Sequence, residues 1–347
     1  MVFCAAPVFS QEDQYFQPPG FHPRFSLAWD FLARFDRIDH LTTYSAIQRG
    51  RFELRPEGDV DLSDRLRVGV RAVFDDGTEP NYDDLAYFDN YHSRGAALER
   101  YYVLATPGPF AIRAGAFGMP LLATEMLWDH DVQTPGASVA WQDSTGSLTL
   151  AAAGFYGPQR NHDRSRIAAG QAIWRGGDDS RLSWELAAAY WSFDIRNLDG
   201  AYVRQNTRGP AEPYRGYATD FHLGDLLLRF HFPLGGLPVL VSLDGIDNFA
   251  APRRKRLAFE GTAAVGSLGT PGRWRAFYTY QYVQRDAVVG AYNTDDWWFH
   301  TWYEGHRAGI GVTILPRVYV QLAGMLQRRL DADRWVHRYT LDLVKLF

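Results

Sequence analysis

Apolar and polar side chains alternate with a period of two through most of this 347-residue chain, and this pattern limits the possible folds more than any other feature. In residues 46–61, for example, Phe52 and Leu54 fall on one face, and Arg51 and Glu53 fall on the other. An extended strand with one apolar and one polar face has this period. The sequence therefore predicts an all-β fold.

The alternation recurs in sixteen segments, and the connections between them alternate in length. Short turns are followed by longer polar connections, as in outer-membrane barrels with short periplasmic turns and long extracellular loops. We therefore predict a transmembrane antiparallel β-barrel of about sixteen strands over residues 25–347. The predicted strands are residues 25–35, 46–61, 65–74, 96–106, 110–117, 136–142, 147–156, 167–175, 181–193, 219–232, 238–248, 256–266, 274–285, 305–314, 317–328 and 335–347, and the long connections are 75–95, 118–135, 157–166, 194–218 and 286–304.

Composition excludes several other classes of protein. The mean hydropathy is −0.29, and no stretch reaches the roughly 18 consecutive apolar residues of a membrane-spanning helix. Aromatic residues make up 15% of the chain and it has 32 glycines, which is too rich in rings and bends for a disordered protein. A formal net charge of −4 argues against a nucleic-acid-binding protein.

Both ends of the chain resemble signals of exported proteins. Residues 1–11 resemble the end of a secretory signal peptide, and residues 12–24 are then an N-terminal periplasmic segment. The only cysteine, Cys4, lies in the first stretch, so a mature exported chain would form no wrong disulfide. The C-terminal segment has an apolar face and resembles the assembly signal of outer-membrane barrels through Tyr339, Leu341, Leu343 and Phe347.

Three stretches resemble a porin family of Gram-negative outer-membrane β-barrel proteins. They are TEMLWDHDVQTPG at 124–136, GGLPVLVSLDGIDN at 235–248 and YQYVQRDAVVGAYNTDDW at 280–297, followed by the segment GHRAGIGVTI. The resemblance covers most of the chain from about residue 45 onward. It implies a passive pore in the bacterial outer membrane, with no cofactor and no catalytic residues.

The polar faces predict the lining of this pore. If the apolar faces contact lipid, the opposite faces surround the lumen, where water keeps a run of charges hydrated and their field selects permeants. The alternation would also fit a solvated sheet of a soluble protein, but the loop lengths and the terminal phenylalanine favour the barrel. The predicted pore-lining residues are Arg49, Arg51, Glu53, Arg55, Arg65, Arg67, Arg71 and Arg113.

The third long connection, residues 118–135, is the expected constriction. In porins generally the third outer loop folds into the barrel, so this resemblance places Glu125, Asp129 and Asp131 opposite the arginine wall. The resulting transverse field would admit small polar solutes, and the excess of arginine predicts a weak preference for anions. The alternative is that these acids only solubilise a surface loop.

A search for catalytic motifs supports a protein that is not an enzyme. No nucleophile elbow, phosphate-binding loop or zinc-protease motif occurs in the sequence. Residues that could serve metal or acid–base chemistry are better explained as loop and wall groups; they are His130 with Asp129 and Asp131, the pair His300 and His306, and the pair Asp295 and Asp296.

Other functions stay open on the sequence alone. The barrel could be a sheath for a periplasmic redox or export partner, or a receptor-like scaffold whose loops bind a ligand. A sheath needs a lumen without a folded-in loop. For a porin we expect outer-membrane lipid and lipopolysaccharide, the barrel-assembly machinery and small polar solutes or ions as partners, together with a homotrimer.

Overall fold

The computed structural model describes residues 25–39, 46–75, 96–130, 132–156, 165–195, 206–207, 217–294 and 296–345. The predictions made for residues 1–11 and 12–24, for Asp131 and Asp295, and for the terminal Phe347 lie outside these ranges. In the described part of the chain, no helix is long and apolar enough to cross a membrane.

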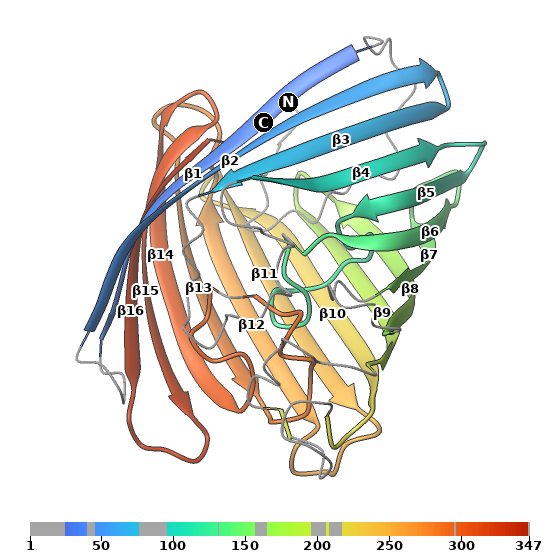
Figure 1. The fold of residues 1–347 in the computed structure, drawn as a ribbon. Coiled ribbons are helices and arrows are strands. Elements are labelled where there is room, and N and C mark those ends of the chain that lie inside the picture. Colours follow the sequence, from blue (N-terminus) through green and yellow to red (C-terminus); the bar gives the residue numbers. More distant parts are fainter. Residues whose placement is uncertain are drawn as a thin grey trace.

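The sixteen predicted strands are confirmed, and they close into one antiparallel barrel (Figure 1). Each strand pairs with its neighbours in sequence, and β1 closes the ring by pairing with β16 from Phe31 opposite Lys345 to Asp39 opposite His337. The strands are β1 Phe25–Asp39, β2 Ala46–Ser63, β3 Leu66–Asp75, β4 Ala97–Ala105, β5 Phe110–Phe117, β6 Thr134–Gln142, β7 Leu148–Tyr156, β8 Arg166–Asp178, β9 Leu182–Asp194, β10 Phe221–Leu234, β11 Leu237–Asn248, β12 Leu257–Gly266, β13 Trp274–Val283, β14 Tyr303–Leu315, β15 Val318–Arg329 and β16 Val336–Lys345.

The two faces of the barrel differ as the alternation predicts. Large apolar side chains lie exposed on the outside, among them Leu27, Leu226 and Leu341, which are 74%, 55% and 48% exposed. Charged side chains such as Asp36 and Arg338 lie buried on the inside. A closed ring pairs the backbone groups of every strand, and an apolar outer face suits contact with lipid.

Aromatic residues mark both ends of the outer face. Trp174, Trp184 and Trp274 are partly exposed near the short turns. At the opposite end the hydroxyl of Tyr190 lies 2.9 Å from Nδ1 of His222 on the neighbouring strand. Two such bands are typical of membrane barrels, whose rings gather at the two interfaces with water.

Candidate functional site: the lumen and its infolded loops

Two long connections fold back into the barrel. Residues 118–133 join β5 to β6, and residues 284–302 join β13 to β14; both cross the middle of the barrel in Figure 1. Met126 and Trp128 of the first loop and Val288 and Tyr292 of the second are at most 1% exposed. The first loop lies where the resemblance places it.

The second infolded loop corrects the sequence interpretation. We expected residues 286–304 to be an outer loop open to solvent, but the structure buries most of them inside the barrel. The physical reason is their apolar content, because Ala287, Val288 and Val289 are removed from water only when the segment turns inward. The apolar run AVVGAY was the signal in the sequence for this arrangement.

The two loops pack against each other. The rings of Trp128 and Tyr292 are stacked with centroids 5.3 Å apart and an interplanar angle of 2°. The backbone N–H of Asp129 donates to the carbonyl of Tyr292 at 2.7 Å, and the N–H of Thr294 donates to the carbonyl of Glu125 at 3.1 Å. These contacts make the loops one packed unit across the lumen.

The wall beneath this unit carries an apolar patch on β8, β9 and β10. Leu122 of the first loop belongs to a small buried cluster with Ile173, Ala187 and Leu227. The side chain of Gln171 accepts a hydrogen bond from the backbone of Leu122 at 2.8 Å and donates one to its carbonyl at 2.6 Å. This side of the barrel is therefore packed like a protein core, although a barrel of sixteen strands is wide enough for an aqueous interior.

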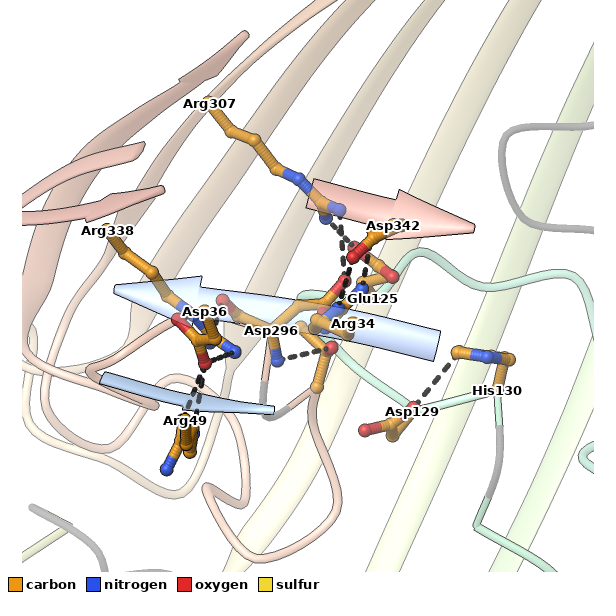
Figure 2. A network of polar contacts seen from close by, with 11 residues as sticks. Arg34, Asp36, Arg49, Glu125, Asp129, His130, Asp296, Arg307, Arg338 and Asp342 are labelled. Atoms are coloured by element: carbon orange, nitrogen blue, oxygen red, sulfur yellow. Dashed lines mark hydrogen bonds and ion pairs between the residues drawn. The ribbon is translucent and has the colours of Figure 1, made fainter. Parts of the chain in front are cut away.

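Ion pairs join both loops to the opposite wall, as Figure 2 shows. Asp296 of the second loop pairs with Arg34 of β1, and with Arg307 of β14 at 2.9 Å. Arg307 also reaches Glu125 of the first loop at 3.2 Å. Arg338 of β16 donates to the backbone carbonyl of Asp296 at 2.5 Å. The loops are thus held between the apolar wall and this cationic one.

Asp296 is ionised in this setting. Burial opposes its charge, but the guanidinium groups of Arg34, Arg307 and Arg338 hold the pKa of Asp296 well below its usual value. In the sequence, Asp296 was considered only together with Asp295, as a carboxylate pair that could serve acid–base chemistry. Its contacts give it a positioning role, and the arginines that hold it come from strands far away in the sequence.

Two of the three predicted constriction acids, Glu125 and Asp129, lie in the described residues, and both are buried. Glu125 pairs with Arg307 on β14 rather than with an arginine of β2 or β3. Asp129 is 2% exposed, and its carboxylate lies 3.1 Å from Nδ1 of His130, whose own side chain is largely exposed. The first loop therefore uses Glu125 to anchor itself.

The predicted wall residues of β2, β3 and β5 fall into three groups. Arg55 and Arg71 are buried and both pair with Glu99 of β4, at 3.4 Å and 2.6 Å, and Glu53 lies beside Arg55 at 2.5 Å. Arg113 stacks over the ring of Tyr102 at 4.9 Å. The third group stays partly accessible. Arg49 pairs with Asp36 at 2.7 Å, Arg67 pairs with Asp61 at 2.8 Å, and Arg51 is half-buried. Arg65 lies exposed in the turn before β3 and is not part of the strand wall.

Three residues of this wall escaped the sequence interpretation. The register between β3 and β4 shifts between Arg71 and Ala72, so Glu99 and Arg100 both lie buried although they are neighbours in sequence. Strict alternation would place one of them outside. Arg100 lies 3.6 Å from Glu57, another carboxylate that we had not assigned to the pore. The wall therefore carries more negative charge than the arginines alone suggest.

A buried acidic group on β10, β11 and β12 was also missed. Asp244 faces Glu260 across the strand pair and accepts a hydrogen bond from the hydroxyl of Thr124 in the first loop at 2.5 Å. Asp225 accepts one from the indole of Trp191 at 3.2 Å. The described residues contain no group of three or more His, Cys, Asp or Glu side chains arranged to hold a metal ion. Asp244 lies in the DGIDN stretch, and its inward position is the signal that could have identified it.

The two other candidate histidines, His300 and His306, make contacts within the loop and on the barrel wall. Nδ1 of His300 lies 3.0 Å from the side-chain oxygen of Asn293, whose amide donates to the carbonyl of His300 at 2.6 Å, so this pair closes the second loop. His306 lies on the outer face, where its Nδ1 is 2.7 Å from the hydroxyl of Tyr278. The interpretation of both as loop and wall groups is consistent with these contacts.

Comparison with known proteins shows the fold. No family model matches the chain, and no curated protein matches it. Among solved structures it is similar to OprB from Pseudomonas putida, with a TM-score of 0.63, 10% identity and coverage of 92% of this chain and 93% of that one. It is also similar to OccAB1 from Acinetobacter baumannii, with a TM-score of 0.54, 10% identity and coverage of 96% and 100%. A BenF-like porin from Pseudomonas fluorescens gives a TM-score of 0.51, 12% identity and coverage of 94% and 99%. The chain therefore has a porin-type barrel fold.

Proposed function

We propose that this protein is an outer-membrane porin through which small hydrophilic solutes or ions diffuse passively. The observation that carries the proposal is the division of the lumen by the two infolded loops. They fill the side next to β8, β9 and β10, and they leave the charged wall of β2, β3 and β4 as the polar side.

The ends of the charged wall fit a hydrated path, whereas Arg71, Glu99 and Arg100 nearer its middle are buried. Arg67 and Asp61 keep 21% and 18% of their side-chain surface accessible although they face the inside. Arg49 keeps 12%. Charged groups that retain contact with water avoid the large cost of full desolvation. Alternating arginines and carboxylates along this wall would favour polar solutes over apolar ones.

This function implies a place and an orientation. An apolar outer face with aromatic bands supports insertion in the bacterial outer membrane, with the short turns in the periplasm and the long connections outside. Outer-membrane lipid, lipopolysaccharide and the barrel-assembly machinery are then its partners, and a homotrimer is the assembly that we propose. No cofactor and no catalytic step are part of the proposal.

The alternatives fit the lumen less well. A sheath around a periplasmic redox or export partner needs free space along the barrel axis, and here Trp128, Tyr292 and their neighbours occupy the middle. A receptor-like barrel would need an open ligand site on the long connections. The anchored loops favour a narrowed channel instead.

Reconstitution tests the proposal. The purified full-length protein in planar bilayers should give stepwise single-channel conductance, and reversal potentials in a salt gradient should show weak anion preference. Liposomes that contain the protein should swell with small sugars and much less with large ones. Folded, heat-modifiable protein that gives no conductance and no swelling would contradict a diffusion channel and would revive the scaffold alternatives.

A further inference from the structure

A strongly basic loop joins two strands at one end of the barrel, where its backbone also contacts the second infolded loop: the N–H of Asp286 donates to the carbonyl of Lys255 at 2.7 Å. Residues 253–256 read Arg-Arg-Lys-Arg, the longest run of basic residues in a chain whose net charge is −4. They belong to the β11–β12 connection, residues 249–256, at the end of the barrel that carries the long connections (Figure 1). The hairpin is closed by a hydrogen bond at 2.9 Å from the N–H of Asn248 to the carbonyl of Arg256.

The four basic side chains are not equally engaged. Arg256 pairs with Asp247 at 2.9 Å, and Lys255 donates to the hydroxyl of Thr207 at 3.1 Å. Arg253 and Arg254 are exposed, and within the described residues neither has an ion-pair partner. The tip of the loop therefore presents two unpaired guanidinium groups on a fixed hairpin.

The surface next to this loop is apolar. Phe249, in the same connection, is 59% exposed, and Leu257 and Phe259 on the outer face of β12 are 44% and 42% exposed. Tyr190 and His222 of the aromatic band lie at the same end of the barrel, on β9 and β10. The loop thus lies where the apolar surface ends, which is the level of lipid headgroups in a membrane barrel.

We propose that Arg253 and Arg254 bind the phosphate groups of a phosphorylated glycolipid in the outer leaflet. Guanidinium groups bind phosphate through paired, charge-assisted hydrogen bonds. The acyl chains of the same molecule would lie on Phe249, Leu257 and Phe259, which a free anion or a nucleic acid would leave uncovered. The inference rests on the membrane orientation proposed above, and it does not depend on what passes through the lumen.

Lipid titration of the full-length protein in non-ionic detergent, read by native mass spectrometry, tests this site. The probes are bisphosphorylated lipid A and the same lipid without phosphate. We expect tight binding of the phosphorylated lipid and loss of about 30-fold in affinity in Arg253→Gln/Arg254→Gln, since each arginine near an anionic headgroup contributes about one kcal/mol. A matched double variant at the short-turn end, Arg181→Gln/Arg273→Gln, removes two exposed arginines and should keep the wild-type affinity.

Several outcomes would overturn the site. Equal affinity of the wild-type protein for the two lipids would overturn the site without any variant. An equal loss of affinity for the phosphorylated lipid in the two double variants would also overturn it. Competition by inorganic phosphate at concentrations similar to those of the lipid would indicate a free-anion site instead. Conductance is a separate readout: a barrel that binds the lipid but carries no current would contradict the channel and leave this inference standing.

Discussion

Arg307 on β14 and Asp296 in the second infolded loop form a buried ion pair at 2.9 Å, and the same guanidinium group lies 3.2 Å from Glu125 in the first infolded loop (Figure 2). One arginine on the wall therefore fixes two loops that are far apart in the sequence. Because both loops also pack on each other through Trp128 and Tyr292, a change at this point should affect the whole obstruction in the lumen.

Replacing Asp296 tests this coupling. Asp296→Asn leaves buried arginines without their charged partner, and removal of one partner of a buried pair typically costs about 3–5 kcal/mol. We expect a less stable barrel in urea titration and larger, noisier single-channel currents. The control is Asp331→Asn, which breaks an exposed pair with Arg329 and should change stability by about 1 kcal/mol or less. Equal effects of the two variants would contradict the anchoring role of Asp296.

The anchor should also resist acid. The arginines keep the pKa of Asp296 well below its ordinary 3.8. A group whose pKa is lower in the folded protein contributes stability above its unfolded pKa and loses it as the pH falls through the folded value. Single-channel currents should therefore show no loosening of the second loop between pH 7 and about pH 4, and should change only at lower pH.

A step at higher pH would need a different origin. Burial raises the pKa of Glu125, so protonation of that carboxyl group would weaken its contact with Arg307 first. Such a step should disappear in Glu125→Gln. A step between pH 4 and pH 7 that persists in Glu125→Gln and is absent in Asp296→Asn would contradict the assignment of a low pKa to Asp296.

Cysteine labelling of intact cells tests the inward course of the second loop. Val289→Cys should resist a membrane-impermeant maleimide, because Val289 is 1% exposed. Arg334→Cys, in the exposed β15–β16 connection, should react, and Thr145→Cys, in a short turn, should react only after the outer membrane is permeabilised. Rapid labelling of Val289→Cys would indicate that residues 286–304 lie on the outer surface. Labelling of Thr145→Cys from outside would contradict the proposed orientation of the barrel.

The strands could be predicted because their information is local. A period of two recurs along the strands, since the apolar outer face and the polar inner face constrain each residue separately. The course of residues 284–302 depends instead on partners such as Trp191, Arg34 and Gln327, which come from other parts of the barrel. Only the unusual apolar content of this connection signals its position in advance.

The charged wall was predictable in type but not in pairing. Arg55 and Arg71 stand at inward positions of the alternation, whereas their shared partner Glu99 depends on an irregularity in register between β3 and β4. Sequence periodicity does not reveal such a bulge. The ion-pair partner of Glu125 was not predictable for the same kind of reason, because Arg307 lies on β14, far away in the sequence.

Deletion of the terminal Phe347 tests the predicted assembly signal. Tyr339, Leu341 and Leu343 lie exposed on the outer face of β16, so the segment offers an apolar edge at the seam where the barrel closes. We expect the deletion to lower the amount of folded, heat-modifiable protein while export to the periplasm continues. Leu330→Ala, in the β15–β16 connection, is a control that should assemble normally. Wild-type assembly without Phe347 would remove its role.

The charge of the wall should set ion selectivity. Arg67 and Arg71 lie on β3, and Arg71 is paired with Glu99 at 2.6 Å. Neutralising both arginines leaves the wall carboxylates uncompensated, so Arg67→Gln/Arg71→Gln should shift the reversal potential toward cations. Glu99→Gln should shift it toward anions. Both shifts should shrink as salt rises, because the Debye length falls from roughly 10 Å at 0.1 M to about 3 Å at 1 M.

A variant of the first infolded loop, compared with the variant of the β3 wall, tests where the narrowest section of the channel lies. Asp129→Asn/Asp131→Asn removes the acids that the sequence assigned to the constriction, and it should shift the reversal potential toward anions if permeating ions pass close to that loop. A shift from Arg67→Gln/Arg71→Gln without one from the loop variant would place the ion path along β3, away from the tip of the loop. An unchanged reversal potential in both variants at 0.1 M salt would mean that neither surface lines the ion path. At this salt concentration the Debye length is about 10 Å, so a change of two charges in a narrow lumen must alter the field on a passing ion.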